Sequence, residues 1–353
     1  MPLVTWVWFG AHLPWYTCAQ DRVFVKTILS LLVIVAAAAL IEGSAKAQPS
    51  PQPPRIGILT PGALGELSDS DSRSGYATLL SGLQELGYGK GRNIIVEFRR
   101  AEGKLDLLPG LAAELVRLKV AAIVANGPEA IKPAIKATKT IPIVMVGGGD
   151  PVGLEFVESL SLPGGNVTGL SSFGGEKMRG KQMELLRDAI PSLTRVALLN
   201  SRELKGYIQA FQRLAKALRV ELQSVDVNRP EQFEEAFAKI TAMRPDALIT
   251  AREFLTISHR KQIVDFALKK RLPSMFESRE SAEAGGLLSY GVNDRASWRR
   301  AAAFVDKILK GANPANLPVE APQFELVINL GTAKKLGITI APELLLEADE
   351  VIK

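Results

Sequence analysis

The sequence predicts an α/β protein built on two parallel β-sheets with helices on both faces. From Arg55 onward, short apolar runs alternate with amphipathic segments, and continuous apolar runs are typical of strands covered on both faces. Repeated strand–helix units form parallel sheets joined by right-handed crossovers. The chain has 353 residues, whereas a single core stops growing at roughly 250 to 300 residues. Two sheets of about five strands each therefore fit the length better than one sheet of about ten.

The apolar runs and the helical segments can be placed along the chain. The predicted strands are residues 56–59, 94–98, 121–125, 143–146, 167–170, 196–199, 222–225, 247–250, 274–276 and 287–289. Between them, apolar side chains recur on one helical face. These faces are Tyr76, Leu79, Leu80 and Leu83; Leu108, Leu111, Ala112 and Leu115; Tyr207, Phe211, Leu214 and Leu218; and Trp298, Ala302, Val305 and Leu309.

The N-terminal region has the residue order of a cleaved export signal. Lys26 precedes fourteen residues, 28–41, in which Ser30 is the one polar side chain. This run is too short to span a membrane. Ala45-Lys46-Ala47 then places small residues where a signal peptidase cleaves. We expect residues 1–47 to comprise an upstream segment and a cleaved signal peptide, and the protein to reach the periplasm; the alternative is a buried core helix.

Composition argues against several classes of function. The single cysteine, Cys18, cannot form an intramolecular disulfide or a multi-cysteine zinc site, and His12 and His259 are the only histidines. We therefore expect no metal and no cofactor. The net charge of +6 is spread along the chain, which predicts a soluble protein with no nucleic-acid partner. Four prolines within residues 48–54 predict an extended tether.

The candidate binding site lies in the loops that follow the predicted strands. In parallel α/β sheets, ligands bind beyond the carboxyl ends of the strands, where helix N-termini offer free N–H groups. These loops are rich in hydroxyls, amides and glycines, which suits a small polar solute; for each residue the alternative is a turn or a cap. The candidate ligand-binding residues are Thr60, Gly62, Asn126, Gly127, Gly149, Asp150, Ser172, Asn200, Arg252, Glu277 and Tyr290.

Two of these candidates carry specific alternatives. Asp150 either anchors the ligand by its charge or caps a helix that starts near Pro151. Arg252 either holds a carboxylate in a bidentate pair or is an exposed arginine near a helix start. No catalytic residue is predicted.

Six segments carry a resemblance to a known family: residues 83–88, 101–106, 150–153, 162–170, 283–291 and 324–329. The longest are Leu162-Pro163-Gly164-Gly165-Asn166-Val167-Thr168-Gly169-Leu170 and Glu283-Ala284-Gly285-Gly286-Leu287-Leu288-Ser289-Tyr290-Gly291. Together they closely resemble the ABC-transporter substrate-binding proteins, a family that includes the tryptophan- and tyrosine-type binding proteins of bacteria. The resemblance runs from about Arg55 to Lys353.

The resemblance implies a type I periplasmic binding protein, in which two Rossmann-like lobes joined by three crossing hinge segments close on a ligand. Lobe one would comprise residues 55–168 and 293–317, and lobe two residues 169–287 and 323–353. The hinge crossings would lie near residues 167–172, 288–292 and 318–323. Such a protein is a monomer that delivers its solute to an ABC permease in the inner membrane and is not an enzyme.

The sequence departs from the family pattern in two loops. Asn126-Gly127-Pro128 lacks the hydroxyl that relatives carry before this proline, and residues 147–149 are richer in glycine. Both changes leave room and free backbone N–H groups. The resemblance therefore predicts a small polar organic solute, such as an amino acid or a related carboxylate, without assigning an aromatic one.

Three other functions compete with transport. A sugar-repressor-like regulator shares the two-lobed fold but adds a helix-turn-helix DNA-binding head, whereas this N-terminus carries the features of an export signal and a proline tether. An exported enzyme would need a catalytic pattern, but Gly169-Leu170-Ser171-Ser172-Phe173 lacks the last glycine of a nucleophile elbow. His259, followed by Arg260 and Lys261, is expected on a solvated helix face. A ligand-sensing partner of a membrane receptor would use the same fold, and the sequence does not separate sensing from transport.

Overall fold

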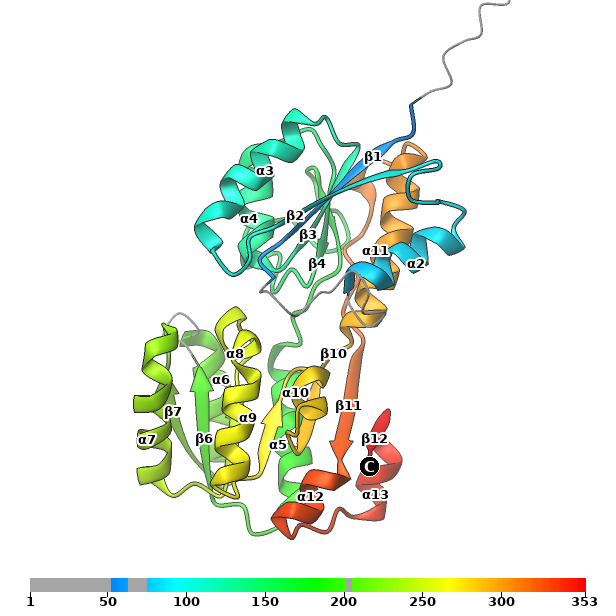
Figure 1. The fold of residues 1–353 in the computed structure, drawn as a ribbon. Coiled ribbons are helices and arrows are strands. Elements are labelled where there is room, and N and C mark those ends of the chain that lie inside the picture. Colours follow the sequence, from blue (N-terminus) through cyan, green and yellow to red (C-terminus); the bar gives the residue numbers. More distant parts are fainter. Residues whose placement is uncertain (1–51, 63–74, 201–204) are drawn as a thin grey trace, which may run out of the picture. The chain divides into compact units, whose positions relative to one another are not determined.

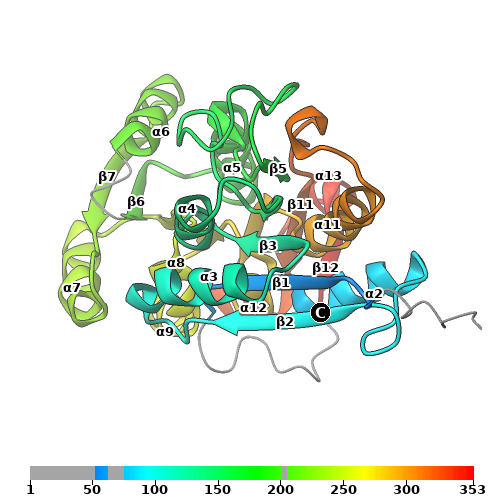
Figure 2. The same ribbon diagram turned by 90° about the horizontal axis from the view of Figure 1, so that it is seen from above.

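The computed structural model describes residues 52–62, 75–200 and 205–353, which form two β-sheets flanked by helices (Figure 1, Figure 2). The predicted signal peptide and most of the predicted tether lie outside the described residues. Among the helices that are described, none combines the length and the apolar character needed to cross a membrane.

The first sheet is five-stranded in the described part of the chain, with the order β2-β1-β3-β4-β5, and all of its printed pairings are parallel. Its strands are β1 (Arg55–Thr60), β2 (Ile95–Arg100), β3 (Ala122–Asn126), β4 (Ile143–Val146) and β5 (Val167–Gly169). The sequence prediction of these five strands is confirmed, with shifts of one or two residues at their ends.

Helices cover both faces of this sheet, as its continuous apolar strands predict. They are α2 (Gly75–Glu85), α3 (Leu108–Arg117), α4 (Pro128–Ala137) and α11 (Asp294–Leu309). Because side chains alternate along a strand, Ile56 and Ile58 of β1 pack in the cluster that contains α2 and α11, whereas Leu59 packs in the cluster with α3 and α4. Figure 1 shows α11, which is distant in sequence, beside α2.

The second sheet has seven strands among the described residues, in the order β12-β11-β10-β9-β8-β6-β7. Its strands are β6 (Arg195–Asn200), β7 (Glu221–Asp226), β8 (Ala247–Thr250), β9 (Ser274–Phe276), β10 (Leu288–Val292), β11 (Phe324–Asn329) and β12 (Glu350–Ile352). The five that the sequence predicts, β6 to β10, are confirmed, although β10 extends three residues further than expected.

The expectation of about five parallel strands is wrong for this sheet. β11 and β12 are additional strands, and β11 runs antiparallel to β10, with Leu288 opposite Ile328 and Val292 opposite Phe324. The chain leaves the second sheet along β10, forms α11 on the first sheet, and returns along β11. A strand that enters where its neighbour leaves must run in the opposite direction, so an antiparallel pair follows from this path.

Helices also cover both faces of the second sheet. On one face lie α5 (Gly175–Ala189), α6 (Lys205–Ala217), α12 (Leu330–Leu336) and α13 (Pro342–Glu347), which share one apolar cluster. On the other lie α7 (Phe233–Met243) and α9 (Arg260–Lys269). The short helices α8 (Phe254–Ser258) and α10 (Arg279–Glu283) follow β8 and β9.

The three segments that connect the two sheets are hydrogen-bonded to one another. Leu170, just after β5, forms a parallel bridge with Glu320, and the Ser171 amide donates to the Glu320 carbonyl at 3.0 Å. The Asn293 amide, just after β10, donates to the Gln323 carbonyl at 2.7 Å. The segment around residues 320–323 therefore lies between the other two.

Gly291 is required where β10 passes the end of β9. A Cβ at this position would lie 1.9 Å from the carbonyl oxygen of Glu277, well inside any allowed contact. We expect Gly291→Ala to lower the free energy of unfolding by about 1 to 3 kcal/mol through overpacking, as measured by urea denaturation. Gly110→Ala in α3 is the control, because no atom lies within 4 Å of its added Cβ, and this change should leave stability unchanged or raise it. Equal stabilities of the two variants would contradict this account.

Candidate functional site

The predicted site residues of the first sheet lie in loops at the carboxyl ends of its strands. Thr60 ends β1 and is 1% exposed, and its hydroxyl accepts a hydrogen bond from the Gly62 amide at 3.3 Å. Half-buried Asn126 ends β3. Gly127 follows with a φ of 77° as the N-cap of α4, so a left-handed backbone turns the strand into the helix. These residues shape the strand ends through their backbone conformation.

The loop after β4 is bound to the first connecting segment. The Gly149 amide donates to the Ser172 hydroxyl at 2.9 Å, and the Ser171 hydroxyl donates to the Gly149 carbonyl at 2.9 Å. Gly149 has a φ of 64°, which favours glycine at this turn. The structure thus brings together Gly149 and Ser172, two residues that the sequence assigned to the site from different lobes.

Asp150 closes a turn. Its Oδ1 accepts a hydrogen bond from the Gly153 amide at 3.0 Å, and the Leu154 amide donates to the Asp150 carbonyl. The expectation of a helix starting near Pro151 is wrong, because residues 151–155 form turns with no continuing helix. Asp150 therefore caps a turn that follows β4.

Asn200, at the end of β6, is 1% exposed and hydrogen-bonded within the second sheet. Its Nδ2 donates to Asp226 at 3.0 Å, and its Oδ1 accepts from the Ser224 hydroxyl at 2.7 Å. Both partners lie on the neighbouring strand β7. The side chain of Asn200 thus joins the ends of two strands, a role that the sequence assignment to the ligand did not include.

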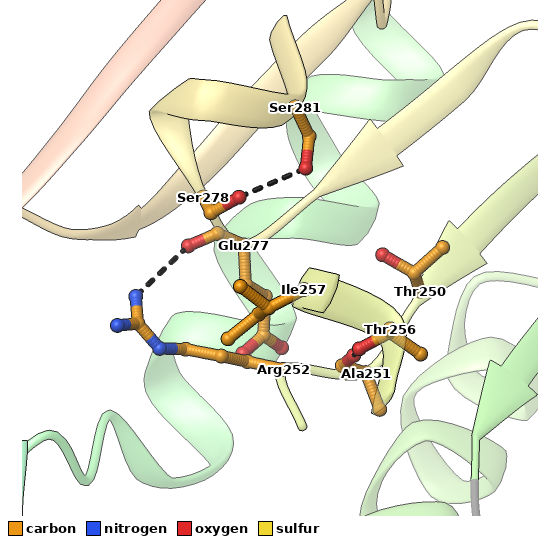
Figure 3. Close-up of a pocket in the computed structure, with 8 residues that line it drawn as sticks. All are labelled: Thr250, Ala251, Arg252, Thr256, Ile257, Glu277, Ser278 and Ser281. Carbon is orange, nitrogen blue, oxygen red and sulfur yellow. Dashed lines mark hydrogen bonds between the residues drawn. The ribbon is translucent and has the colours of Figure 1, made fainter. Parts of the chain in front are cut away.

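Arg252, in the loop after β8, lies at a small cavity of about 10 Å³, roughly the room that one water molecule needs. Figure 3 shows its guanidinium directed toward the backbone carbonyl of Glu277, which Nη1 contacts at 3.5 Å. Nη2 donates to both carboxylate oxygens of Asp294 at 2.8 and 2.6 Å. Arg252 is therefore held in an ion pair, and the surface-arginine alternative does not describe it.

The rest of this cavity is polar and comes from three short segments. Its lining consists of Thr250, Ala251, Arg252, Thr256, Ile257, Glu277, Ser278 and Ser281. The Ser278 and Ser281 hydroxyls lie 2.8 Å apart, and the Thr256 hydroxyl donates to the Ala251 carbonyl at 2.6 Å (Figure 3). The first of these contacts lies within the segment after β9 and the second within the segment after β8. Each therefore stabilises the conformation of its own loop.

The surroundings of Arg252 are acidic. Burial alone would lower the pKa of the Arg252 guanidinium, but Asp294 raises it above its ordinary value, and Glu280 and Glu277 add to the rise. Burial and repulsion by Asp294 raise the pKa of Glu280. Arg252 therefore stays protonated at any physiological pH, and it is the cation around which these carboxylates are arranged.

Tyr290 is separated from the other predicted site residues by the direction of its side chain. It packs against the apolar cluster that contains α5 and α13, and its ring stacks on Phe324 with centroids 5.9 Å apart. Burial raises the pKa of its hydroxyl. The backbone carbonyl of Tyr290 accepts a hydrogen bond from Gln182 Nε2 at 2.8 Å, so this residue joins the second connecting segment to α5.

His259 does not lie on a solvated helix face, and that expectation is wrong. The ring is half-buried and lies 4.9 Å from the ring of Phe233, with Nδ1 3.0 Å from the Leu255 carbonyl. The two basic residues that follow His259 suggested exposure. The contact with α7 is made by Phe233, which lies 26 positions earlier in the chain and forms no local pattern with His259.

The family model for ABC transporter substrate binding proteins matches residues 68–352. This match covers most of the chain. The protein belongs to the ABC transporter substrate binding protein family. Its two sheets, with their connecting segments, also confirm the expected type I periplasmic binding protein fold, which solved relatives share.

Three relatives of this substrate-binding protein are informative. A tyrosine-binding protein of Clostridioides difficile is 26% identical over 263 residues, which is 73% of this chain and 75% of the relative. A Streptococcus pneumoniae structure of an ABC domain in complex with L-Trp is 26% identical, with a TM-score of 0.77 over 85% of this chain and all of that chain. A conserved domain protein of Vibrio cholerae has the same fold, with a TM-score of 0.76, 24% identity, and coverage of 84% of this chain and 99% of that chain.

Sequence reasoning missed Asp294 in this substrate-binding protein. Asn293-Asp294 precedes an amphipathic helix, and such a pair is explained fully by capping, since the Asn293 side chain accepts from the Ala296 amide. The partner of Asp294 lies 42 residues away, and no local pattern links the two. One signal could have paired them. Arg252 follows strand β8, and Asp294 begins the helix that follows the later strand β10.

The position of Asn200 predicts a stability effect. Asn200→Ala removes the hydrogen bonds of Asn200 to Asp226 and Ser224, so we expect the free energy of unfolding to fall by about 1 to 3 kcal/mol, measured by urea denaturation. Ser224→Ala removes only one of these hydrogen bonds and should cost less. Wild-type stability of Asn200→Ala would show that the amide is not needed between β6 and β7.

Proposed function

We propose that this protein is the periplasmic substrate-binding component of an ABC importer for an amino acid. Its loops at the strand ends of the two lobes would hold the solute, the lobes would close on it, and the closed form would deliver it to a permease in the inner membrane. Family membership supports the substrate-binding role, and the identity of the solute, the closure and the delivery are the steps we add.

The observation that carries the choice of an amino acid is the likeness to the L-Trp complex. That structure is matched over its whole length at 26% identity, and the Clostridioides difficile relative is named for tyrosine binding. Tryptophan and tyrosine share an α-ammonium and an α-carboxylate and differ in the side chain. We therefore propose that the solute carries an α-ammonium and an α-carboxylate, and we propose no particular side chain for it.

The described residues offer matching charges at the strand ends. Arg252 presents a guanidinium, which can hold a carboxylate by two parallel hydrogen bonds. Asp150, in the loop after β4 of the first sheet, and Glu277, directly after β9 of the second, present carboxylates that suit an ammonium group. Binding of this kind needs ion pairs and hydrogen bonds alone and no catalytic step.

The cavity beside Arg252 is far smaller than an amino acid, because it has room for about one water molecule. All of its lining residues lie at or after the ends of β8 and β9 of the second sheet, so the solute would bind outside this cavity, beside Arg252. Bending of the three connecting segments is the movement that the fold offers, and such hinges absorb lobe closure in proteins of this architecture. We therefore place the movement that encloses the solute in the connecting segments and not in the loops around the cavity.

We expect an L-amino acid to stabilise and compact the protein. Differential scanning fluorimetry with L-tryptophan, L-tyrosine and L-leucine should identify a ligand, because a solute at a hundred times its dissociation constant adds about 2.7 kcal/mol to the free energy of unfolding. Small-angle scattering should then show a smaller radius of gyration when that ligand is added, since closure excludes water from between the lobes.

The matched controls are the amine and the acid that each lack one charged group: tyramine and 3-(4-hydroxyphenyl)propionate for tyrosine. Both should stabilise the protein less than the amino acid. A panel in which no amino acid raises the melting temperature would refute the proposed solute class, and a tight ligand that leaves the radius of gyration unchanged would refute closure.

Export and processing form a separate prediction. If the Ala45-Lys46-Ala47 site is cleaved, protein recovered from the periplasm should begin at Gln48, and N-terminal sequencing or intact-mass measurement would show it. Ala47→Lys should block cleavage, because a large charged residue replaces the small residue at the cleavage position. A soluble mature form that retains residues 28–41 would disprove this processing.

A further inference from the structure

The first turn of α11 is bound to three elements of the second sheet. Asn293 Nδ2 donates to Glu325 of β11 at 3.2 Å. Asp294 accepts two hydrogen bonds from Arg252 in the loop after β8, and Arg295 pairs with Glu283 of α10 at 3.3 Å. Three consecutive residues thus reach three different parts of the same sheet.

The rest of α11 packs on the first sheet. Trp298, Ala302 and Val305 belong to the apolar cluster that includes β1, β3, β4 and α2. At Gly82 of α2 the two helices are so close that an added Cβ would lie 2.9 Å from the side chain of Ala302. One helix therefore carries the polar contacts of the second sheet at its start and the apolar contacts of the first sheet along its body.

Of these three polar contacts, the Arg252–Asp294 pair is the one at the strand-end cavity. It is also partly open to water, with 21% and 30% of the two side chains exposed, whereas the Arg279–Glu325 pair next to Asn293 is 10% and 7% exposed. A partly exposed ion pair can exchange partners at low cost, because water replaces the broken bonds. The more buried pair lacks this property.

We propose that Asp294 occupies the place of the solute's carboxylate on Arg252, and that the solute displaces Asp294 when it binds. This inference rests on the proposed function, since it requires a carboxylate-bearing solute at the strand ends. Both oxygens of the Asp294 carboxylate contact Nη2, and an α-carboxylate that engages the guanidinium by two parallel hydrogen bonds needs the same donors. Asp294 and the solute then exclude each other.

The exchange also connects binding to the hinge. Asp294 is the first residue of the helix whose body packs on the first sheet, so release of Asp294 frees the start of α11 from the loop after β8. A solute that takes Arg252 thereby removes one of the contacts by which α11 is held to the second sheet. The measured dissociation constant equals the intrinsic one divided by the fraction of molecules in which Asp294 has left Arg252. The Arg252–Asp294 pair therefore weakens the measured affinity.

The test is the affinity of Asp294→Asn by isothermal titration calorimetry. The probe is whichever of L-tryptophan, L-tyrosine and L-leucine binds the wild-type protein most tightly. Asparagine keeps the size of the side chain at the start of the helix but removes its charge, so the competitor is lost. We expect affinity to rise at least about fivefold, the lower end of ordinary coupling between sites.

Two controls separate exchange from general loosening of the hinge. Arg295→Gln breaks the neighbouring Arg295–Glu283 pair and leaves Arg252 untouched, so affinity should stay within about twofold of wild type. In an Arg252→Ala background, which should bind weakly, Asp294→Asn should have no further effect. The carboxamide of the probe amino acid, which lacks the carboxylate, should gain nothing from Asp294→Asn.

The outcomes are distinguishable from failure of the proposed function. If the wild-type protein binds none of the three amino acids, the proposed function fails. If the wild-type protein binds but Asp294→Asn binds equally well or more weakly, the proposed function stands and the exchange is refuted. An equal gain in Arg295→Gln would also refute it, because the gain would then come from loosening of α11.

Discussion

The backbone hydrogen bonds among the three connecting segments are the constraint on which the rest of the structure depends. Residue 170 pairs with residue 320, and residue 293 with residue 323, so none of the segments can slide without breaking bonds in its neighbour. The first of these segments also holds a loop of the candidate site, since the Ser172 hydroxyl accepts from the Gly149 amide and the Ser171 hydroxyl donates to the Gly149 carbonyl. The connecting segments and this loop of the candidate site are therefore hydrogen-bonded to each other. A movement of the connecting segments would also move the loop.

Most of the fold could be predicted because burial leaves a local signal. Strands covered on both faces are continuous apolar runs, and each run that the sequence analysis predicts as a strand is a strand in the structure. β11 and β12 were missed for different reasons. β11 carries Glu325, which is buried and paired with Arg279, so its polarity hid the strand. β12 has three residues and forms only because β11 is beside it.

The candidate site was less predictable because its partners are distant in sequence. Residue type and position at a strand end identified the right loops, and the Gly149–Ser172 contact lies within them. They could not reveal that Asn200 is engaged by β7 or that Arg252 faces Asp294, since these pairs span 26 and 42 residues. The direction of the Tyr290 side chain likewise depends on α5 and Phe324, which form no local pattern with it.

The Arg252–Asp294 and Arg279–Glu325 ion pairs near the start of α11 differ in the free energy that their separation would cost. Breaking a buried pair by removing one partner costs about 3 to 5 kcal/mol, because the remaining charge is left without water. This cost opposes separation of the Arg279–Glu325 pair, and the bonds of Arg279 to Glu325 and Glu350 hold the pKa of Arg279 above its ordinary value. A pair that water reaches costs less to separate, because water replaces the broken bonds, and micromolar binding supplies about 8 kcal/mol. A solute can therefore separate Arg252 from Asp294 and still bind, while the Arg279 pair keeps α10, β11 and the start of α11 together.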